Sequence, residues 1–151
     1  MIIPPNIWGP NIWYIVHGIS YKISNENFLK YKNEFIELIK LLFTNLPCPD
    51  CSKHASDKLN KTNFDNILSK DDMIKFLFNF HNHVNKKTNN NTFLYEKLYI
   101  YKKINLNNIY NNIIIIYNNN TNIPQLMSEN FRSKQAYPKI KNHLNLLLKI
   151  I

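Results

Sequence analysis

Cys48 and Cys51 are the only cysteines of the 151-residue chain, and they stand one helical turn apart in Cys48-Pro49-Asp50-Cys51. A Cys-x-x-Cys pair serves as a redox dithiol or as half of a metal site. Pro49 is the residue type favoured at the first position of a helix, which predicts that Cys48 is the helix N-cap. Unpaired backbone N–H groups and the positive end of the helix dipole would favour a thiolate there. A structural disulfide or two buried thiols stay open as alternatives.

Composition limits what this pair can do. The length fits one domain, or one small domain with an appendage, and two cysteines cannot build a disulfide scaffold. The formal net charge is +9, but the charges are scattered, which predicts a solvated surface and no nucleic-acid groove. We expect no membrane span, since the longest apolar run is too short, and a cytoplasmic location, since Met1–Pro5 shows no secretory signal. In a reducing compartment a Cys-x-x-Cys is more often catalytic or metal-binding than structural.

Apolar residues at helical spacing predict four helices. The segment Pro4–Pro10 is typical of extended, turn-like chain, and the first helix is expected after it. A second helix is predicted from about Asn27 to Asn45, a third from Cys48 to about Leu59, and a fourth from Ser69. The apolar face of the fourth helix consists of Met73, Phe76, Leu77, Phe80 and Val84.

One stripe of the first helix combines an indole, an imidazole and a phenol. Trp13, His17 and Tyr21 are spaced by four and therefore share a face. Such a face can stack on a flat heteroaromatic ligand and hydrogen-bond it. It can equally be a core face on which a backbone carbonyl satisfies His17, and these residues alone favour that second interpretation.

The fourth helix carries a polar strip beside its apolar face. His81, Asn82 and Asn85 form it. Burying amides and an imidazole midway along an apolar helix costs free energy unless a partner hydrogen-bonds them. A polar ligand is the simplest explanation of this strip.

Three motifs follow one another along the chain. They are Trp8-Gly9-Pro10-x-x-Trp13-x-x-x-His17, Cys48-Pro49-Asp50-Cys51-x-x-His54 and Phe80-His81-Asn82-His83-Val84-Asn85. In order and spacing, over roughly residues 5–103, they resemble the Erv/ALR family of FAD-dependent sulfhydryl oxidases. The first motif and the histidine after the cysteines look most like versions carried by large DNA viruses.

The resemblance implies a mainly α fold, a four-helix bundle with a short fifth helix that binds FAD beside the Cys-x-x-Cys. Residues 1–104 would form this FAD-binding domain. The family's Leu-x-Lys-Pro linker before the fifth helix is replaced here by Thr88-Asn89-Asn90-Asn91. The implied cofactor-binding residues are Gly9, Trp13, His17 and Tyr21 from the first helix, His81, Asn82, Val84 and Asn85 from the fourth, Lys86 and Lys87 near the pyrophosphate, and Tyr95 from the fifth.

The resemblance also implies the chemistry. A substrate thiolate attacks Cys48, Cys51 leaves as a thiolate beside the flavin, and the electron pair passes to FAD and then to O2, giving H2O2. Many members carry a second, distal cysteine pair that shuttles electrons inward, and this sequence contains no such pair. Electrons would therefore come from a client dithiol protein or from a thioredoxin-like carrier. Family members are commonly homodimers.

Residues 105–151 lie beyond the resemblance, as a C-terminal appendage of unknown role. The β-branched run Leu106–Tyr117 favours a strand, although a buried helix fits the same run. Asn118–Asn120 is typical of a turn, and a final helix is predicted over Tyr137–Ile150 after Pro138. Such an appendage can pack on the bundle or bind a partner.

Other functions fit parts of the pattern. Cys48, Cys51, His54 and a histidine such as His81 could form a Cys2His2 zinc site, but zinc gives no reason for the stripes on the first and fourth helices. A basic RNA-binding module predicts salt-sensitive binding to nucleic acid and no flavin. A thioredoxin-like fold is disfavoured because that fold needs a strand before the cysteines, where this sequence predicts a helix.

Overall fold

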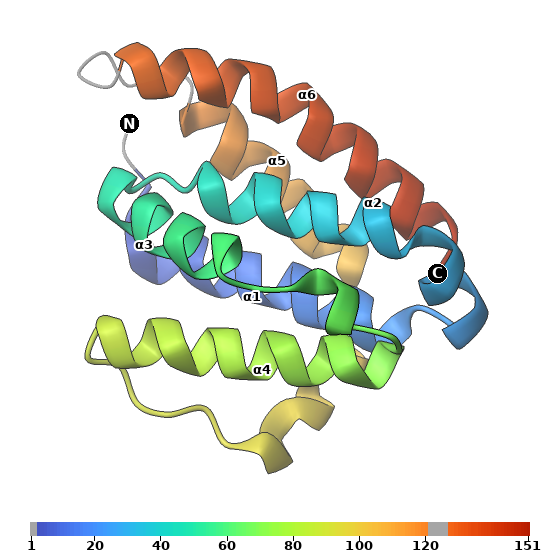
Figure 1. Cartoon of the computed structure of the whole chain (residues 1–151). Coiled ribbons are helices and arrows are strands. Elements are labelled where there is room, and N and C mark those ends of the chain that lie inside the picture. The colour runs from blue at the N-terminus through green and yellow to red at the C-terminus, as the bar shows by residue number, and fades with distance from the viewer. Residues whose placement is uncertain (1–2, 121–126) are drawn as a thin grey trace.

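The computed structural model describes the backbone of residues 3–120 and 127–151, and side chains outside 119–134. These residues form helices and connecting segments, with no strand among them, which confirms the mainly α prediction (Figure 1). The elements are α1 (Pro5–Lys22), α2 (Asn25–Thr44), α3 (Pro49–Asn60), the 3-10 segment η1 (Phe64–Asn66), α4 (Lys70–Lys87), the 3-10 segment η2 (Tyr95–Lys103), α5 (Leu106–Asn120) and α6 (Met127–Lys149).

Side-chain caps fix the starts of α2 and α4. Ser24 caps α2 by accepting a hydrogen bond from the backbone N–H of Asn27 at 3.1 Å. At α4 the Ser69 hydroxyl accepts from the N–H of Asp72 at 3.1 Å, and the Asp72 carboxylate accepts from the N–H of Ser69 at 3.0 Å. Backbone N–H donation from Leu68, with the Ser69 contacts, holds the pKa of Asp72 below its usual range. The predicted start of the fourth helix is confirmed.

Helix α1 begins earlier than the sequence predicts. Pro4 is its N-cap, Pro5 is its first residue, and the helix continues through Pro10. The predicted extended segment Pro4–Pro10 is therefore wrong. A proline at the first helical position sacrifices no hydrogen bond, and Trp8, which is 8% exposed, becomes buried when this turn is helical.

Helices α1 to α4 form the predicted bundle. α1 packs on α4 and α2 packs on α3, while η2 packs on α1 as the short fifth helix that starts, as predicted, at Tyr95. Each fully buried aliphatic side chain between the helices stabilises the fold by about 1.5–3 kcal/mol. The completely buried members of this core include Ile15, Val16, Ile19, Leu38, Ile39, Leu42, Met73 and Leu77.

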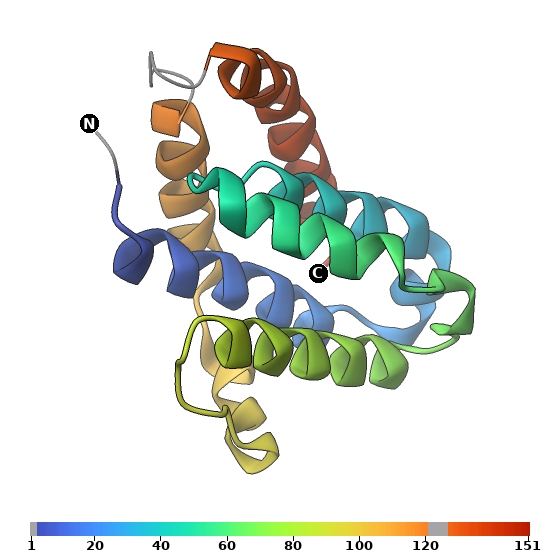
Figure 2. The same ribbon diagram turned by 60° about the vertical axis from the view of Figure 1, so that its left-hand side comes forward.

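Helices α5 and α6 pack on the same bundle. α5 contacts α1, α6 contacts α2, and the two contact each other. Figures 1 and 2 both place α6 and η2 at opposite ends of the molecule. The buried side chains of this pair join the bundle core in one continuous cluster, so residues 105–151 pack on the bundle as part of its core. The assignment of FAD binding to residues 1–104, with residues 105–151 as a separate appendage in function, stays a prediction.

The predicted strand over Leu106–Tyr117 is wrong, because this run is helix α5, and Asn118–Asn120 continues that helix where a turn was predicted. A strand would place Ile113 and Ile115 on one face. Ile113 is completely buried whereas Ile115 is 56% exposed, and Ile116 is buried beside Ile113, as on a helix. Burial against α1 and α6 outweighs the β propensity of isoleucine.

Two polar contacts fasten the C-terminal helices to α2. The Tyr117 hydroxyl donates to the carbonyl oxygen of Leu42 at 2.5 Å, and the Asn27 amide donates to the carbonyl oxygen of Ile150 at 2.8 Å. α6 contains the predicted final helix but starts at Met127, so that Pro138 lies inside it. Within the described residues, no helix has the length and low charge needed to cross a bilayer.

Candidate redox site beside the Cys48–Cys51 disulfide

Cys48 and Cys51 form a disulfide at the N-terminus of α3, with their Cα atoms 5.2 Å apart. Cys48 is the helix N-cap, as predicted, and its sulfur accepts a hydrogen bond from the backbone N–H of Cys51 at 3.2 Å. This N–H and the helix dipole stabilise negative charge on the Cys48 sulfur when the disulfide opens. The helix start is thus suited to thiol–disulfide exchange, and the alternative of two buried thiols is wrong.

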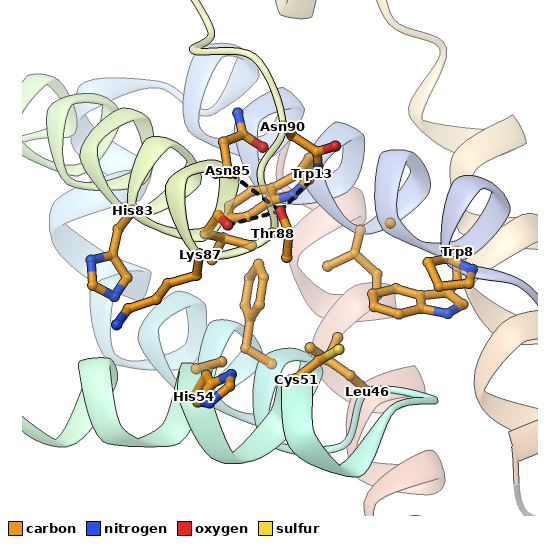
Figure 3. Close-up of a pocket in the computed structure, with 16 residues that line it drawn as sticks. Trp8, Trp13, Leu46, Cys51, His54, His83, Asn85, Lys87, Thr88 and Asn90 are labelled. Atoms are coloured by element: carbon orange, nitrogen blue, oxygen red, sulfur yellow. Dashed lines mark hydrogen bonds between the residues drawn. The ribbon is translucent and has the colours of Figure 1, made fainter.

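A cavity of about 420 Å³ opens beside the disulfide, between α1, α3 and α4 (Figure 3). Its volume lies in the range of small-molecule sites. Cys51 lines it and Cys48 does not, so the two sulfurs of the disulfide have different surroundings. The lining residues are Pro5, Trp8, Gly9, Ile12 and Trp13 from α1, Phe43 and Leu46 from α2 and its C-terminal end, Cys51, His54 and Ala55 from α3, His83, Val84, Asn85 and Lys87 from α4, and Thr88 and Asn90 after it.

The cavity has an aromatic wall and a polar rim. Trp8 and Trp13 stand on the α1 side, whereas His83, Lys87 and the residues after them stand at the C-terminal end of α4 (Figure 3). In the rim, the Asn90 amide donates to the Thr88 hydroxyl at 2.8 Å. Such a cavity suits a ligand with one flat apolar part and one polar, anionic part.

The structure brings some of the predicted cofactor-binding residues to the cavity and leaves others away from it. Gly9 leaves open space there, since a Cβ atom at this position would meet no atom within 4 Å. Those that line the cavity are Gly9, Trp13, Val84, Asn85 and Lys87. Those that do not are His17, Tyr21, His81, Asn82, Lys86 and Tyr95.

Trp13 links the cavity to a stacked aromatic cluster. The His81 ring lies parallel to the Trp13 ring, with centroids 4.0 Å apart, and near-parallel to the Phe93 ring, with centroids 5.4 Å apart. His17 stacks on Tyr101 with centroids 4.3 Å apart, and its Nε2 lies 3.1 Å from Nδ1 of His81. The predicted stripes of the first and fourth helices therefore meet each other in this cluster.

Both histidines of the cluster are neutral at pH 7. Burial, with a smaller effect of neighbouring His81, lowers the pKa of His17 to about 3, and burial lowers the pKa of His81 to about 4. In a neutral pair one ring nitrogen donates and the other accepts. Nδ1 of His17 is completely buried and has no hydrogen-bond partner among the described residues. A buried nitrogen without a partner costs about 1–3 kcal/mol, which a ligand atom could recover.

The two lowered pKa values predict an acid-sensitive fold. Below pH 6.5 the unfolded chain binds protons that the folded chain excludes, so stability should be complete above about pH 6.5 and should fall toward pH 4. The expected fall is up to about 1.4 kcal/mol per pH unit for each histidine. Urea unfolding at pH 7, 6 and 5 measures it. In His81→Phe, which keeps an aromatic ring and removes one titrating group, the fall should be shallower; equal slopes in both proteins would contradict this explanation.

Asn82 already has partners within the chain. Its side-chain oxygen accepts from the N–H of Phe93 at 2.8 Å, and its amide donates to the Phe93 carbonyl oxygen at 2.9 Å. These bonds tie the segment before η2 to α4 and hold Phe93 on His81. Tyr95 is 56% exposed and meets Phe78 edge-on. Asn82 and Tyr95 therefore have structural roles here, and their contact with FAD stays a prediction.

Sequence reasoning missed much of the cavity wall. Trp8, His54 and His83 stand inside the three motifs, so the motifs could have indicated them. Phe43 and Leu46 precede Cys48 by five and two residues, but nothing in their residue types indicates a ligand site, and the packing of α2 on α3 turns them toward the cavity. A zinc site lacks ligands in the described part of the chain, where no group of three His, Cys, Asp or Glu side chains could hold a metal ion.

Comparison with known proteins places these features in a family. The model of the Erv1 / Alr family matches residues 10–104. A protein of Invertebrate iridescent virus 3 named as an FAD-linked sulfhydryl oxidase is 31% identical over 90 residues, which cover 59% of this chain and 61% of that protein.

The FAD-linked sulfhydryl oxidases of two African swine fever virus isolates, from Kenya and Malawi, are 34% identical over 82 residues, which cover 54% of this chain and 68% of each viral protein. No solved structure matches significantly. The matched stretch contains the disulfide and nearly all of the bundle that surrounds it. The chain belongs to the Erv1/Alr family.

Proposed function

We propose that this chain is an FAD-linked sulfhydryl oxidase, which makes disulfide bonds in a dithiol protein and delivers the electrons through the Cys48–Cys51 disulfide and FAD to O2, giving H2O2. The observation that carries this proposal is that Cys51 lines an aromatic cavity, whereas Cys48, which caps the helix and is partly exposed, does not line it. The family and the names of the viral relatives support it.

The residues present fit FAD. A flat isoalloxazine ring suits a cavity walled by Trp8, Trp13 and Phe43, with Cys51 in the same wall. Lys87 and Asn85 at the rim, with Lys86 beside them on the last turn of α4, would hold the pyrophosphate through their cationic and amide groups. The unpartnered Nδ1 of His17 lies in the neighbouring cluster that shares Trp13 with this cavity, and His17 itself does not line the cavity.

The disulfide divides the thiol chemistry between its two sulfurs. A substrate thiolate attacks the partly exposed Cys48, a mixed disulfide forms, the Cys48–Cys51 bond breaks, and Cys51 leaves as a thiolate on the cavity side. The second substrate thiol attacks the substrate sulfur of the mixed disulfide and releases Cys48. When bound beside Cys51, FAD would supply the acceptor for the electron pair of the dithiol and the reactivity toward O2.

The donor thiols come from outside these residues. The 151 residues contain two cysteines, and both form the disulfide. We therefore propose a client dithiol protein or a thioredoxin-like carrier as the electron donor, reacting with Cys48 in the cytoplasm. A homodimer is proposed from the family. Its interface would use other faces than the sides of α1 and α2 that α5 and α6 cover.

The direct test is oxygen uptake. Purified protein should be yellow and should consume O2 in the presence of dithiothreitol, with one H2O2 formed for each O2 consumed. Colourless protein that stays inactive after FAD is added would contradict the proposal.

Filling the cavity at Gly9 should expel the cofactor without unfolding the protein. A Cβ atom at Gly9 would meet no atom within 4 Å, so Gly9→Phe can place its ring in the open space, and replacing a helical glycine by Phe favours α1 by roughly 0.3–0.5 kcal/mol. We expect at least tenfold weaker FAD binding, an effect of about 1.4 kcal/mol, measured by retained absorbance after dialysis. Ile7→Phe is the control, because Ile7 is 51% exposed on the same helix. If Gly9→Phe binds FAD as tightly as this control, the flavin lies elsewhere.

A further inference from the structure

His54 stands one helical turn after Cys51. Residues three apart on a helix are neighbours, with Cβ atoms about 5–6 Å from each other. Both side chains line the cavity, and Figure 3 shows both on the side of α3 that faces α1 and α4. His54 is also exposed to solvent, whereas Cys51 is partly buried. An imidazole that is open to water thus stands one turn from the inner cysteine of the disulfide and lines the same cavity.

Few groups at this cavity can move a proton. Among its described lining residues, Cys51, His54, His83 and Lys87 are the titratable ones, and the walls from α1 and α2 are not titratable. No carboxylate belongs to this lining. On α3, Asp50 and Lys58 stand four residues before and after His54, and Asp57 stands three residues after it, so these charged groups flank it. Of these groups, an imidazole is the one whose ordinary pKa suits proton transfer near neutral pH.

His83 and Lys87 are less suited to the task than His54. Both reach the cavity from α4, across from α3 (Figure 3). Burial, and then the nearby cations Lys58 and Lys87, lower the pKa of His83, which makes this imidazole a weaker base. A lysine ammonium has three donors and no acceptor. His54 is left as the base on the same helix as Cys51.

We propose that His54 is the proton acceptor for Cys51 in thiol oxidation, an inference that rests on the proposed oxidase function. In the reduced site the S–H bond of Cys51 breaks, and the proton forms an N–H bond with the unprotonated ring nitrogen of His54. The products are a Cys51 thiolate on the cavity side and an imidazolium that releases its proton to solvent. No electron moves in this step; it prepares the sulfur that then gives up the electron pair as the Cys48–Cys51 bond closes.

The test is the rate of flavin reduction by dithiothreitol under anaerobic stopped-flow conditions, as a function of pH. In His54→Gln the rate at pH 7 should fall by about 10²-fold, the lower end of general-base effects. The rate should then rise by about tenfold per pH unit toward the wild-type value, as the thiols ionise without help. Reoxidation by O2, which does not use this base, should be unchanged.

His143→Gln on α6 is the matched control, because it makes the same change far from the cavity lining, and its rates should equal wild type. If His54→Gln reduces its flavin with the wild-type rate and pH profile, the proposal is wrong. A slow variant whose pH profile parallels wild type would also overturn it, since that result assigns His54 a structural role. Failure of the oxidase function is distinguishable, because wild type itself would then lack a flavin that dithiothreitol reduces.

Discussion

Replacing Cys48 with serine is expected to abolish dithiol oxidation while the protein keeps its FAD. Serine fills nearly the same volume and can still cap α3 from the N-cap position, so the helix and the cavity beside it should persist. The substrate thiolate, however, has no disulfide to attack. Oxygen uptake with dithiothreitol should fall to the uncatalysed background, whereas the flavin absorbance per protein should match wild type. Undiminished uptake would show that electrons reach the flavin without this disulfide.

Cys51→Ser is the matched variant, because it removes the other sulfur. It should also lose turnover, but its Cys48 thiolate can attack the disulfide of an oxidised client, which forms a mixed disulfide with Cys48 and releases one client thiol. Without Cys51 the pair cannot close again, so such an adduct should accumulate on a non-reducing gel and vanish on reduction. If Cys48→Ser accumulated such an adduct and Cys51→Ser did not, Cys51 would be the cysteine that exchanges with the client, contrary to the proposed roles.

Shortening Leu144 to alanine is expected to destabilise the whole protein. Leu144 of α6 is completely buried and belongs to the core cluster that continues into α1 and α2. Deleting buried methyl groups from such a core lowers the free energy of unfolding by about 2–5 kcal/mol. Denaturant unfolding followed by circular dichroism measures this loss, and flavin release should follow the same transition.

Ile115→Ala is the control for this experiment. Ile115 belongs to α5 and is 56% exposed, so its truncation should change the free energy of unfolding by less than about 0.5 kcal/mol. If residues 105–151 were an independent appendage, Leu144→Ala would leave the main unfolding transition and the flavin untouched. That result would contradict the continuous core.

Local signals explain which helices could be predicted from the sequence. Ser69 and Asp72 form a capping box, and the cap at Cys48 followed by Pro49 marks the start of α3. The secondary structure of Leu106–Tyr117, in contrast, depends on packing against helices that are distant in the sequence. Its isoleucines fit a strand or a helix equally well, and only the surfaces of α1 and α6 decide between them.

The site shows the same limit. The motifs led to Trp13, Cys51 and Asn85, which line the cavity, but nothing near Phe43 in the sequence indicates that α2 brings it to the disulfide. The stripe with His17 left a ligand face and a core face as alternatives. In the structure His17 is completely buried in the aromatic cluster, as the core interpretation predicts. Its Nδ1 has no hydrogen-bond partner among the described residues, which leaves one polar atom that the core does not satisfy.

The central claim is that an electron pair passes from a thiol through the Cys48–Cys51 disulfide to FAD, and a single anaerobic reduction tests it most directly. Wild-type protein mixed with dithiothreitol in the absence of O2 should lose its oxidised-flavin absorbance and regain it when O2 is admitted, with one H2O2 for each flavin reoxidised. Cys48→Ser should stay yellow throughout. Bleaching of Cys48→Ser at the wild-type rate, or a wild-type protein that binds no flavin, would contradict the account.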